Sequence, residues 1–242
     1  MNVQKENVII TASDARYGNF LIDHWLKSLT ANVDLDNIDV IVLDYGLSED
    51  QRKRLKETQA VKVHACKRDG HIVIIRFRDI SNLLKNTTYK QVLTCDGGDI
   101  IFQKDIHHLF EKDMHTFRAV CEDYPLPLNK LVSLQKSIDV KIMPEIQKYS
   151  SNKRPVNAGV LVGPREKFIE LCDFCYKYTT NKEKFGSDQI LINYFLYKNG
   201  FVELDREYNF IVYSAKSSFR IRNGVFLDEA GNVIPVVHNA GR

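Results

Sequence analysis

The first hundred residues alternate between short β-rich apolar runs and amphipathic helical patterns, and this alternation constrains the fold more than any other feature. The predicted strands cover residues 8–12, 40–43, 61–65 and 91–95, and the predicted helices cover about 17–29, 48–58 and 79–85. Three strand–helix alternations predict a Rossmann-like, doubly wound α/β fold, with a mostly parallel central sheet and helices on both faces. Such sheets bind ligands at the carboxyl ends of their strands.

The second half of the chain has a different pattern, from which we expect the sheet to become mixed. Strands are predicted at 117–122, 156–162 and 233–237, helices at 165–179 and 188–197, and a partly helical excursion at 134–151. Asn223-Gly224, between apolar segments, predicts a type I′ hairpin. No linker separates the two halves, so the prediction is one domain over residues 1–242.

The composition restricts the class of protein and its partners. With 34 Lys+Arg, 31 Asp+Glu and 44% hydrophobic residues, the chain has the profile of a globular protein. It lacks both the ~18-residue apolar run of a membrane-spanning helix and the apolar core of a signal peptide, so we expect a cytoplasmic protein without an integral membrane segment. The net charge of +3 is dispersed, which predicts no nucleic-acid partner and leaves peripheral contact with an anionic membrane open. The five cysteines are odd in number and scattered, so we expect them to be reduced.

Acidic residues follow the predicted strands, where a doubly wound sheet places its ligands. Asp14 and Asp44 follow the first two strands, and Asp96-Gly97-Gly98-Asp99 follows the fourth. The glycines allow a bulky anionic ligand to approach closely, and the carboxylates can bind a hard divalent cation through oxygen. An ordinary acidic turn would use the same residue types, so the motif alone leaves both interpretations open.

At three other polar positions the residue type also fits either a ligand contact or an ordinary structural role. His238 ends a predicted strand; a lone histidine is more often solvated than metal-bound, but together with Asp99 it suits Mn²⁺ or Mg²⁺. Asn157 begins an apolar strand, and Asp188-Gln189 begins a helix, where a turn or cap residue is also expected.

Several common site motifs are absent or unconvincing. Cys172 and Cys175 form a CxxC, but it lies within a helical pattern and lacks the further ligands that zinc needs, so a core position is favoured. The sequence contains no Walker-type Gly-Lys-Ser/Thr, no Gly-x-Gly-x-x-Gly and no Gly-x-Ser-x-Gly. P-loop NTPases, dinucleotide oxidoreductases and α/β-hydrolases are therefore disfavoured.

Taken in order, these segments resemble the GT-A fold nucleotide-sugar glycosyltransferases, most closely the retaining, glycogenin-like and lipopolysaccharide galactosyltransferase-like family 8. Residues 9–17 look like the family's opening strand and Ala-x-Asp-x-x-Tyr loop, with Ala12, Asp14 and Tyr17 on the positions that hold uridine. Asp99 and the apolar residues after it match the family's Asp-x-Asp motif, with Asp99 as the second, metal-binding aspartate.

The resemblance continues through the second half of the chain. Glu122-Asp123 resembles the acidic position that contacts the donor sugar, and Asn157-Ala158-Gly159 resembles the family's Asn-Ala-Gly strand. The Asp188-Gln189 segment is similar to the Asp-Gln helix start beneath the anomeric carbon. His238 and Gly241 fit the closing His-x-x-Gly, whose histidine is a metal ligand.

The resemblance implies a single GT-A catalytic domain, with residues 1–115 binding the nucleotide and residues 116–242 binding sugar and acceptor. It implies transfer of a hexose from a UDP-sugar with retention, assisted by Mn²⁺ or Mg²⁺. The implied metal ligands are Asp99, His238 and Asp96; the implied catalytic residues are Asp188, Gln189 and Asn157; and the implied donor contacts are Ala12, Asp14, Tyr17, Asp96, Gly97, Asp123, Asn157 and Gly241. Arg78 is a further candidate phosphate contact, although a solvated arginine at a helix start is the slightly more expected interpretation. The acceptor stays open among a glycan, a lipid-linked glycan and a protein, as does the oligomeric state.

Two departures from the family pattern keep alternatives open. Alignment on Asp99 places Gly97 at the first aspartate of Asp-x-Asp and Asp96 one residue too early, so either Asp96 still serves or the metal loses a contact. The sequence also ends at Arg242, whereas the family continues to a lysine that grips the diphosphate. One alternative is therefore a catalytically impaired nucleotide-sugar-binding protein on the same fold. A nucleotidyltransferase shares the layout and the metal, but we find no Gly-rich basic opening loop.

Overall fold

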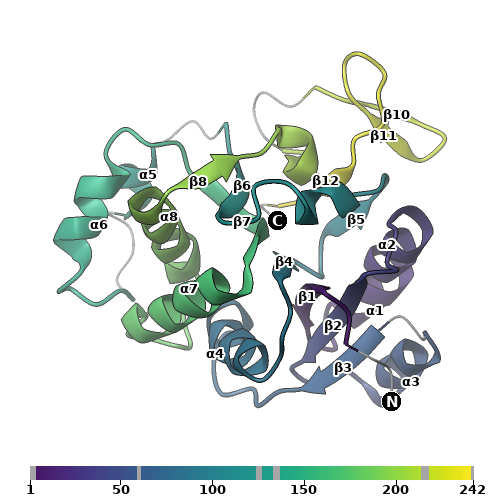
Figure 1. The fold of residues 1–242 in the computed structure, drawn as a ribbon, viewed down its shortest axis with the longest axis horizontal. Helices are drawn as coiled ribbons and strands as arrows, with labels where there is room; N and C mark the ends of the chain where they lie inside the picture. The colour runs from purple at the N-terminus through teal and green to yellow at the C-terminus, as the bar shows by residue number, and fades with distance from the viewer. Residues whose placement is uncertain (1–3, 59–60, 124–126, 133–136, 214–217, 241–242) are drawn as a thin grey trace.

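A seven-stranded sheet forms the centre of the computed structural model, which describes residues 4–58, 61–123, 127–132, 137–213 and 218–240 (Figure 1). The strand order is β3-β2-β1-β4-β7-β6-β8. The bounds of these strands are β1 (Asn7–Ser13), β2 (Ile38–Asp44), β3 (Val61–Ala65), β4 (Gln91–Cys95), β6 (Phe117–Cys121), β7 (Val156–Pro164) and β8 (Phe201–Glu203). The first four strands are parallel, while β7 is antiparallel to both β4 and β6. The predicted change from a parallel to a mixed sheet is confirmed.

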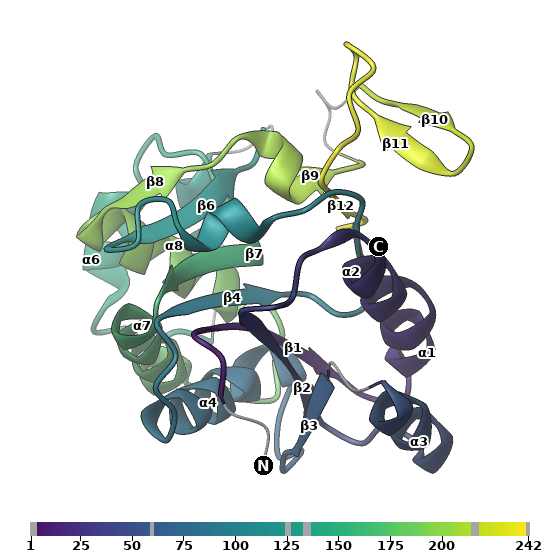
Figure 2. The ribbon, with the colours of Figure 1, turned by 45° about the vertical axis from the view of Figure 1, so that its right-hand side comes forward.

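Helices cover both faces of this sheet, as predicted. Successive side chains of a strand point to opposite faces, and in β1 the side chains on both faces are apolar and buried. On one face Val8 and Ile10 pack into a core with α4 (Ile72–Lys85), α7 (Arg165–Tyr178) and α8 (Ser187–Asn199). On the other face Ile9 packs against Trp25 and Leu55, from the helices that follow β1 and β2 (Figure 2). These helices are α1 (Gly18–Phe20), the π-helical η1 (Leu21–Leu26), α2 (Lys27–Asn32) and α3 (Glu49–Glu57).

A small three-stranded sheet lies beside the central one and was not predicted as a unit. It consists of β5 (Ile100–Phe102), β12 (Val236–His238) and β9 (Phe210–Ile211). The middle strand, β12, is antiparallel to β5 and parallel to β9. The predicted strand at 233–237 therefore begins later and ends on His238, which is held between two neighbours.

The remaining elements lie mainly in the second half of the chain. They are η2 (His107–Phe110), α5 (Leu128–Val132), α6 (Met143–Ser150), η3 (Arg206–Asn209), β10 (Arg220–Arg222) and β11 (Val225–Leu227). The predicted hairpin is confirmed: β10 and β11 pair antiparallel, and Asn223 and Gly224 both have the positive φ angles that a type I′ turn requires. In Figure 2 this hairpin extends away from the central sheet.

The predicted helix at 79–85 is too short. The helix begins at Ile72, because Ile74, Ile75 and Phe77 pack into the core and this burial outweighs the weak helix propensity of an isoleucine-rich segment. All five cysteines are free thiols, as expected. Over the described residues, no helix is both long and apolar enough to cross a membrane.

Candidate active site

The Asp-Gly-Gly-Asp loop leaves β4 and enters β5, with both glycines packed closely against the first strand and its following loop. A Cβ atom on Gly97 would lie 2.5 Å from Thr11 Oγ1, and one on Gly98 would lie 2.9 Å from Tyr17 Cδ1. The Asp96 backbone N–H donates to the Gly159 carbonyl at 3.0 Å. The close packing leaves little room for a side chain at either glycine, and the carboxylates of Asp96 and Asp99 both point toward His238.

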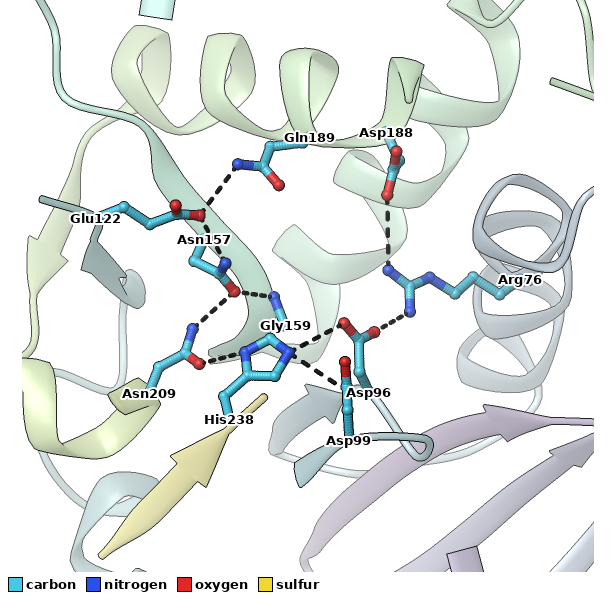
Figure 3. Close-up of polar contacts among 10 residues, drawn as sticks. All are labelled: Arg76, Asp96, Asp99, Glu122, Asn157, Gly159, Asp188, Gln189, Asn209 and His238. Atoms are coloured by element: carbon cyan, nitrogen blue, oxygen red, sulfur yellow. Dashed lines mark hydrogen bonds and ion pairs between the residues drawn. The ribbon is translucent and has the colours of Figure 1, made fainter. Parts of the chain in front are cut away.

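The two carboxylates of this loop meet the imidazole of His238. One donor atom from each of Asp96, Asp99 and His238 lies within 4.8 Å of the others. His238 Nε2 is 3.4 Å from Asp99 Oδ1 and 3.9 Å from Asp96 Oδ2 (Figure 3). The histidine is buried and both carboxylates are partly exposed, so the cluster is open to a ligand from one side. Two carboxylates and one imidazole suit Mn²⁺ or Mg²⁺, and they are the three residues predicted as ligands.

Asn209 determines which nitrogen of His238 faces the carboxylates. Its amide nitrogen donates to Asn157 Oδ1 at 2.9 Å, so its oxygen is left to accept from His238 Nδ1 at 2.8 Å. Because Nδ1 carries the hydrogen, the lone pair of a neutral imidazole lies on Nε2, toward Asp96 and Asp99. A partner of this kind on the second ring nitrogen is the usual support of a metal-binding histidine.

The surroundings of His238 favour positive charge at Nε2. Burial, the largest single influence, disfavours the charged imidazolium, but the hydrogen bond with Asp99 and the negative charges of Asp96, Asp99 and Glu122 outweigh it and raise the pKa of His238. The same carboxylates would stabilise a bound cation in place of the proton.

A network of amides on β7 and α8 continues from this cluster. Glu122 Oε1 accepts from Asn157 Nδ2 at 2.6 Å and from Gln189 Nε2 at 3.2 Å (Figure 3). Asn157 Oδ1 accepts from the Gly159 N–H at 2.8 Å as well as from Asn209. The Gln189 amide nitrogen is therefore turned toward Glu122, whereas Asn157 is buried and its two amide atoms are engaged within the protein.

Asp188 lies buried at the start of α8, and its two carboxylate oxygens have different surroundings. Among the described residues, its Oδ1 accepts no hydrogen bond, and its Oδ2 lies 3.9 Å from Arg76 Nη2. Burial raises the pKa of Asp188 even though the charge of Arg76 acts in the opposite direction. Arg76 also pairs with Asp96, through a 2.7 Å contact between Nη1 and Oδ1.

Two residues predicted to contact the donor, Arg78 and Asp123, do not contact the Asp96–Asp99–His238 cluster, whereas residues close to them in the sequence belong to the site. Arg78 is held by Asp69 and Asp79, whereas Arg76, two residues earlier on α4, contacts Asp96 and Asp188. Asp123 lies 3.8 Å from Arg154, whereas the preceding Glu122 joins the amide network. The roles predicted for Arg78 and Asp123 thus gain no support from their positions and stay predictions.

The residues predicted to hold the nucleotide gather at the carboxyl end of β1. Ala12 lies on that strand, and Asp14 Oδ1 accepts from the backbone N–H of Arg16 and Tyr17 at 3.0 and 3.4 Å. Asp14 Oδ2 pairs with Arg68 Nη1 at 2.9 Å, and Tyr17 is 44% exposed beside the Asp-Gly-Gly-Asp loop. The remaining predicted contact, Gly241, lies outside the described residues.

Arg76 and Asn209 are the polar residues of the site that the sequence patterns missed. Arg76 precedes the predicted start of its helix, although the apolar residues around it would have placed it beside the core. Asn209 stands in a short 3₁₀ segment with no periodicity or motif, so no local signal could have paired it with His238.

Comparison with known proteins gives no match in sequence: no family model and no curated protein matches the chain. In structure the chain is similar to the galactosyltransferase LgtC. A complex of LgtC with donor and acceptor sugar analogues gives a TM-score of 0.63 and 18% identity over 97% of this chain and 87% of that one. An active-site glutamine-to-glutamate mutant of LgtC gives 0.61 and 20% over 97% and 88%.

The chain has the GT-A fold. LgtC is a family 8 galactosyltransferase, so the structural neighbours come from the family that the sequence motifs resemble. The predicted fold, a doubly wound sheet that becomes mixed in its second half, is confirmed.

Proposed function

We propose that this protein is a metal-dependent glycosyltransferase that moves a hexose from a UDP-sugar to an acceptor with retention of configuration. The observation that carries the proposal is the cluster of Asp96, Asp99 and His238, in which hydrogen bonding directs the Nε2 lone pair toward two carboxylates. This cluster lies at the strand ends where a GT-A fold is expected to bind its donor. A cation held there would supply Lewis-acid neutralisation of the leaving diphosphate.

Asp188 and Gln189 suit the sugar side of the bond between the sugar and the diphosphate. Asp188 supplies a buried carboxylate, one oxygen of which accepts no hydrogen bond from the described residues. Glu122 accepts from the Gln189 amide nitrogen and so fixes the direction of the Gln189 side-chain oxygen. Negative charge and carbonyl dipoles fixed in advance stabilise a sugar that becomes positively charged in the transition state. The chain therefore offers cation-binding groups for the diphosphate and electronegative groups for the sugar, in adjoining parts of one site.

Nucleotide binding gives the first test of the proposal. We would measure thermal unfolding with UDP, GDP, ADP and CMP, each with Mn²⁺ and with EDTA, since a ligand at ~100 times its Kd stabilises the native state by ~2.7 kcal/mol. We expect a shift with UDP that requires Mn²⁺, followed by turnover of a UDP-hexose. Tight UDP binding with neither transfer nor hydrolysis would favour a nucleotide-sugar-binding protein. No shift with any of the nucleotides would refute the proposal.

Asp99→Asn gives the sharpest single-residue test. This change keeps the size of the side chain but removes one anionic ligand, so we expect UDP-sugar turnover to be abolished while the metal-free unfolding midpoint is unchanged. Asp105→Asn is the matched control, because Asp105 lies just beyond β5 on the same segment, is exposed and does not belong to the cluster. Wild-type turnover in Asp99→Asn would contradict the metal assignment.

A further inference from the structure

Arg76 links the two acidic parts of the site. Its guanidinium is 13% exposed and reaches from α4 to Asp96 Oδ1 at 2.7 Å and to Asp188 Oδ2 at 3.9 Å (Figure 3). Among the ion pairs of the described residues, Asp96 has cationic partners only in Arg76 and His238. Its two carboxylate oxygens are thereby divided, with Oδ1 toward Arg76 and Oδ2 toward His238 Nε2.

The backbone of Asp96 is fixed more firmly than its side chain. The N–H of Asp96 is bonded to Gly159 and the next two residues are packed against β1 and Tyr17. The carboxylate itself is 34% exposed, and within the described part of the chain its side-chain hydrogen bond is the one from Arg76. Without that bond, rotation about the side-chain torsions would let the carboxylate turn toward solvent and away from Asp99 and His238.

We propose that Arg76 is a positioning residue that holds Asp96 in the metal-binding cluster and so compensates for the additional residue between the two aspartates. The inference rests on the proposed function, since it assigns a role toward the cation of that site. A guanidinium is suited to the task because its planar, charge-assisted hydrogen bond fixes the direction of a carboxylate, and it keeps its charge at any relevant pH. Oδ2 is then the atom that Asp96 offers to the cation.

The direction in which the Mn²⁺ affinity changes when Arg76 is removed separates a positioning role from a purely electrostatic one. A positive charge this close to the cluster repels a cation, so if Arg76 contributed charge alone, its removal would strengthen Mn²⁺ binding. If Arg76 positions Asp96, its removal weakens Mn²⁺ binding despite the lost repulsion. Groups that orient metal ligands typically affect metal affinity by about 10-fold to 100-fold.

The experiment measures the Mn²⁺ Kd by titration calorimetry, with and without UDP, for the full chain and its variants. We expect Arg76→Met to raise the Kd by about 10-fold to 100-fold. Arg76→Lys should lie in between, because lysine keeps the charge and a hydrogen-bonding head group but not the planar fork. Lys85→Met is the control: it removes a cationic side chain from the last turn of the same helix, where Lys85 pairs with Asp173, and should leave the Kd unchanged.

A double-mutant cycle tests whether Arg76 acts through Asp96. In an Asp96→Ala background there is no carboxylate to hold, so adding Arg76→Met should leave the Kd unchanged or lower it by removing repulsion. An equal weakening in both backgrounds would show that Arg76 acts independently of Asp96 and would overturn the inference.

The remaining outcomes are also decisive. An Arg76→Met protein that binds Mn²⁺ as tightly as wild type, or more tightly, refutes the positioning role. If Arg76→Met does not fold, Arg76→Gln takes its place, and a wild-type Mn²⁺ Kd in that folded variant would refute the positioning role. If the wild-type chain binds no Mn²⁺ with or without UDP, the proposed function fails and the role of Arg76 fails with it.

Discussion

Gly159→Ala should disrupt the proposed metal site by the addition of a single methyl group. Gly159 lies on β7 directly beside His238, and a Cβ atom there would overlap His238 Cε1 and lie 2.7 Å from Nδ1 and 2.8 Å from Asn157 Oδ1. The φ angle of Gly159 is not in the left-handed region, so space alone decides the effect. Both neighbours are rigid, because Asn157 is bonded on both amide atoms and His238 is held between β5 and β9.

The size of the effect follows from these distances. Ordinary contact requires about 3.4 Å, so the imidazole must retreat by about 0.7 Å at Nδ1 and further at Cε1. Metal–ligand distances tolerate only ~0.2 Å, so Nε2 would no longer be placed to coordinate the cation. Since disturbing the support of a ligand already costs ~10-fold to 100-fold in affinity, we expect Gly159→Ala to weaken Mn²⁺ binding by at least ~100-fold. UDP-sugar turnover should fall with it.

Gly163→Ala is the control for simple overpacking. It lies on the same strand, and its Cβ would be 2.6 Å from Phe117 Cδ1, in the core and away from the cluster. Both variants should lose about 1–3 kcal/mol of unfolding free energy in urea, but only Gly159→Ala should lose Mn²⁺ affinity. Wild-type Mn²⁺ affinity in a folded Gly159→Ala protein would refute the reasoning, because it would mean that His238 is not held rigidly or is not a ligand.

Two further predictions concern the amide network and the acid limit of stability. Glu122→Leu removes the acceptor shared by Asn157 and Gln189 and should lower kcat by about 10-fold to 100-fold, the equivalent of one hydrogen bond to a charged group. The Mn²⁺–UDP affinity measured by calorimetry should change by a smaller factor, because the charge of Glu122 is the weakest of the influences on His238. Glu122→Gln retains an acceptor and should recover part of the loss; equal kcat values in all three proteins would contradict an orienting role. For Asp39, burial is the largest influence and opposes ionisation, but hydrogen bonds led by that from Lys62 outweigh it and hold its pKa below the ordinary value. The contribution of ionised Asp39 to stability is therefore complete above the unfolded pKa of about 3.9 and is lost as the pH falls through the lower native pKa. We expect the free energy of unfolding of Asp39→Asn, measured in urea, to fall less than that of wild type between pH 5 and pH 3.

The strand–helix alternation was enough to predict the central sheet, because buried parallel strands and amphipathic helices leave periodic patterns in the sequence. The start of α4 was missed because the segment from Ile72 to Phe77 lacks such a pattern. Apart from its one arginine it is apolar and partly β-branched, so no polar face of a helix can be recognised. Only its packing on the sheet settles its conformation. The consequence was functional, since the arginine within that segment is the one that faces the site.

The site residues that belong to short sequence motifs were predictable, whereas those that reach the site from segments without a motif were not. Asp99 and His238 follow from motif resemblance, and the structure places them within 3.4 Å of each other. The position of Asp96 depended on whether two glycines could fit against Thr11 and Tyr17, which spacing alone does not reveal. Asn209 lacks any pattern, because its role is defined entirely by partners from β7 and β12.

The small sheet determines when the proposed metal site can be completed as the chain is synthesised. All seven strands of the central sheet have emerged once β8 is made, and Asp96 and Asp99 are by then in place beside β4. The imidazole arrives later, on β12, which must insert between β5 and β9 before Nε2 can face the carboxylates. Cation binding at the proposed site would therefore require that β12 has docked, and we expect a chain interrupted between β8 and β12 to lack that site.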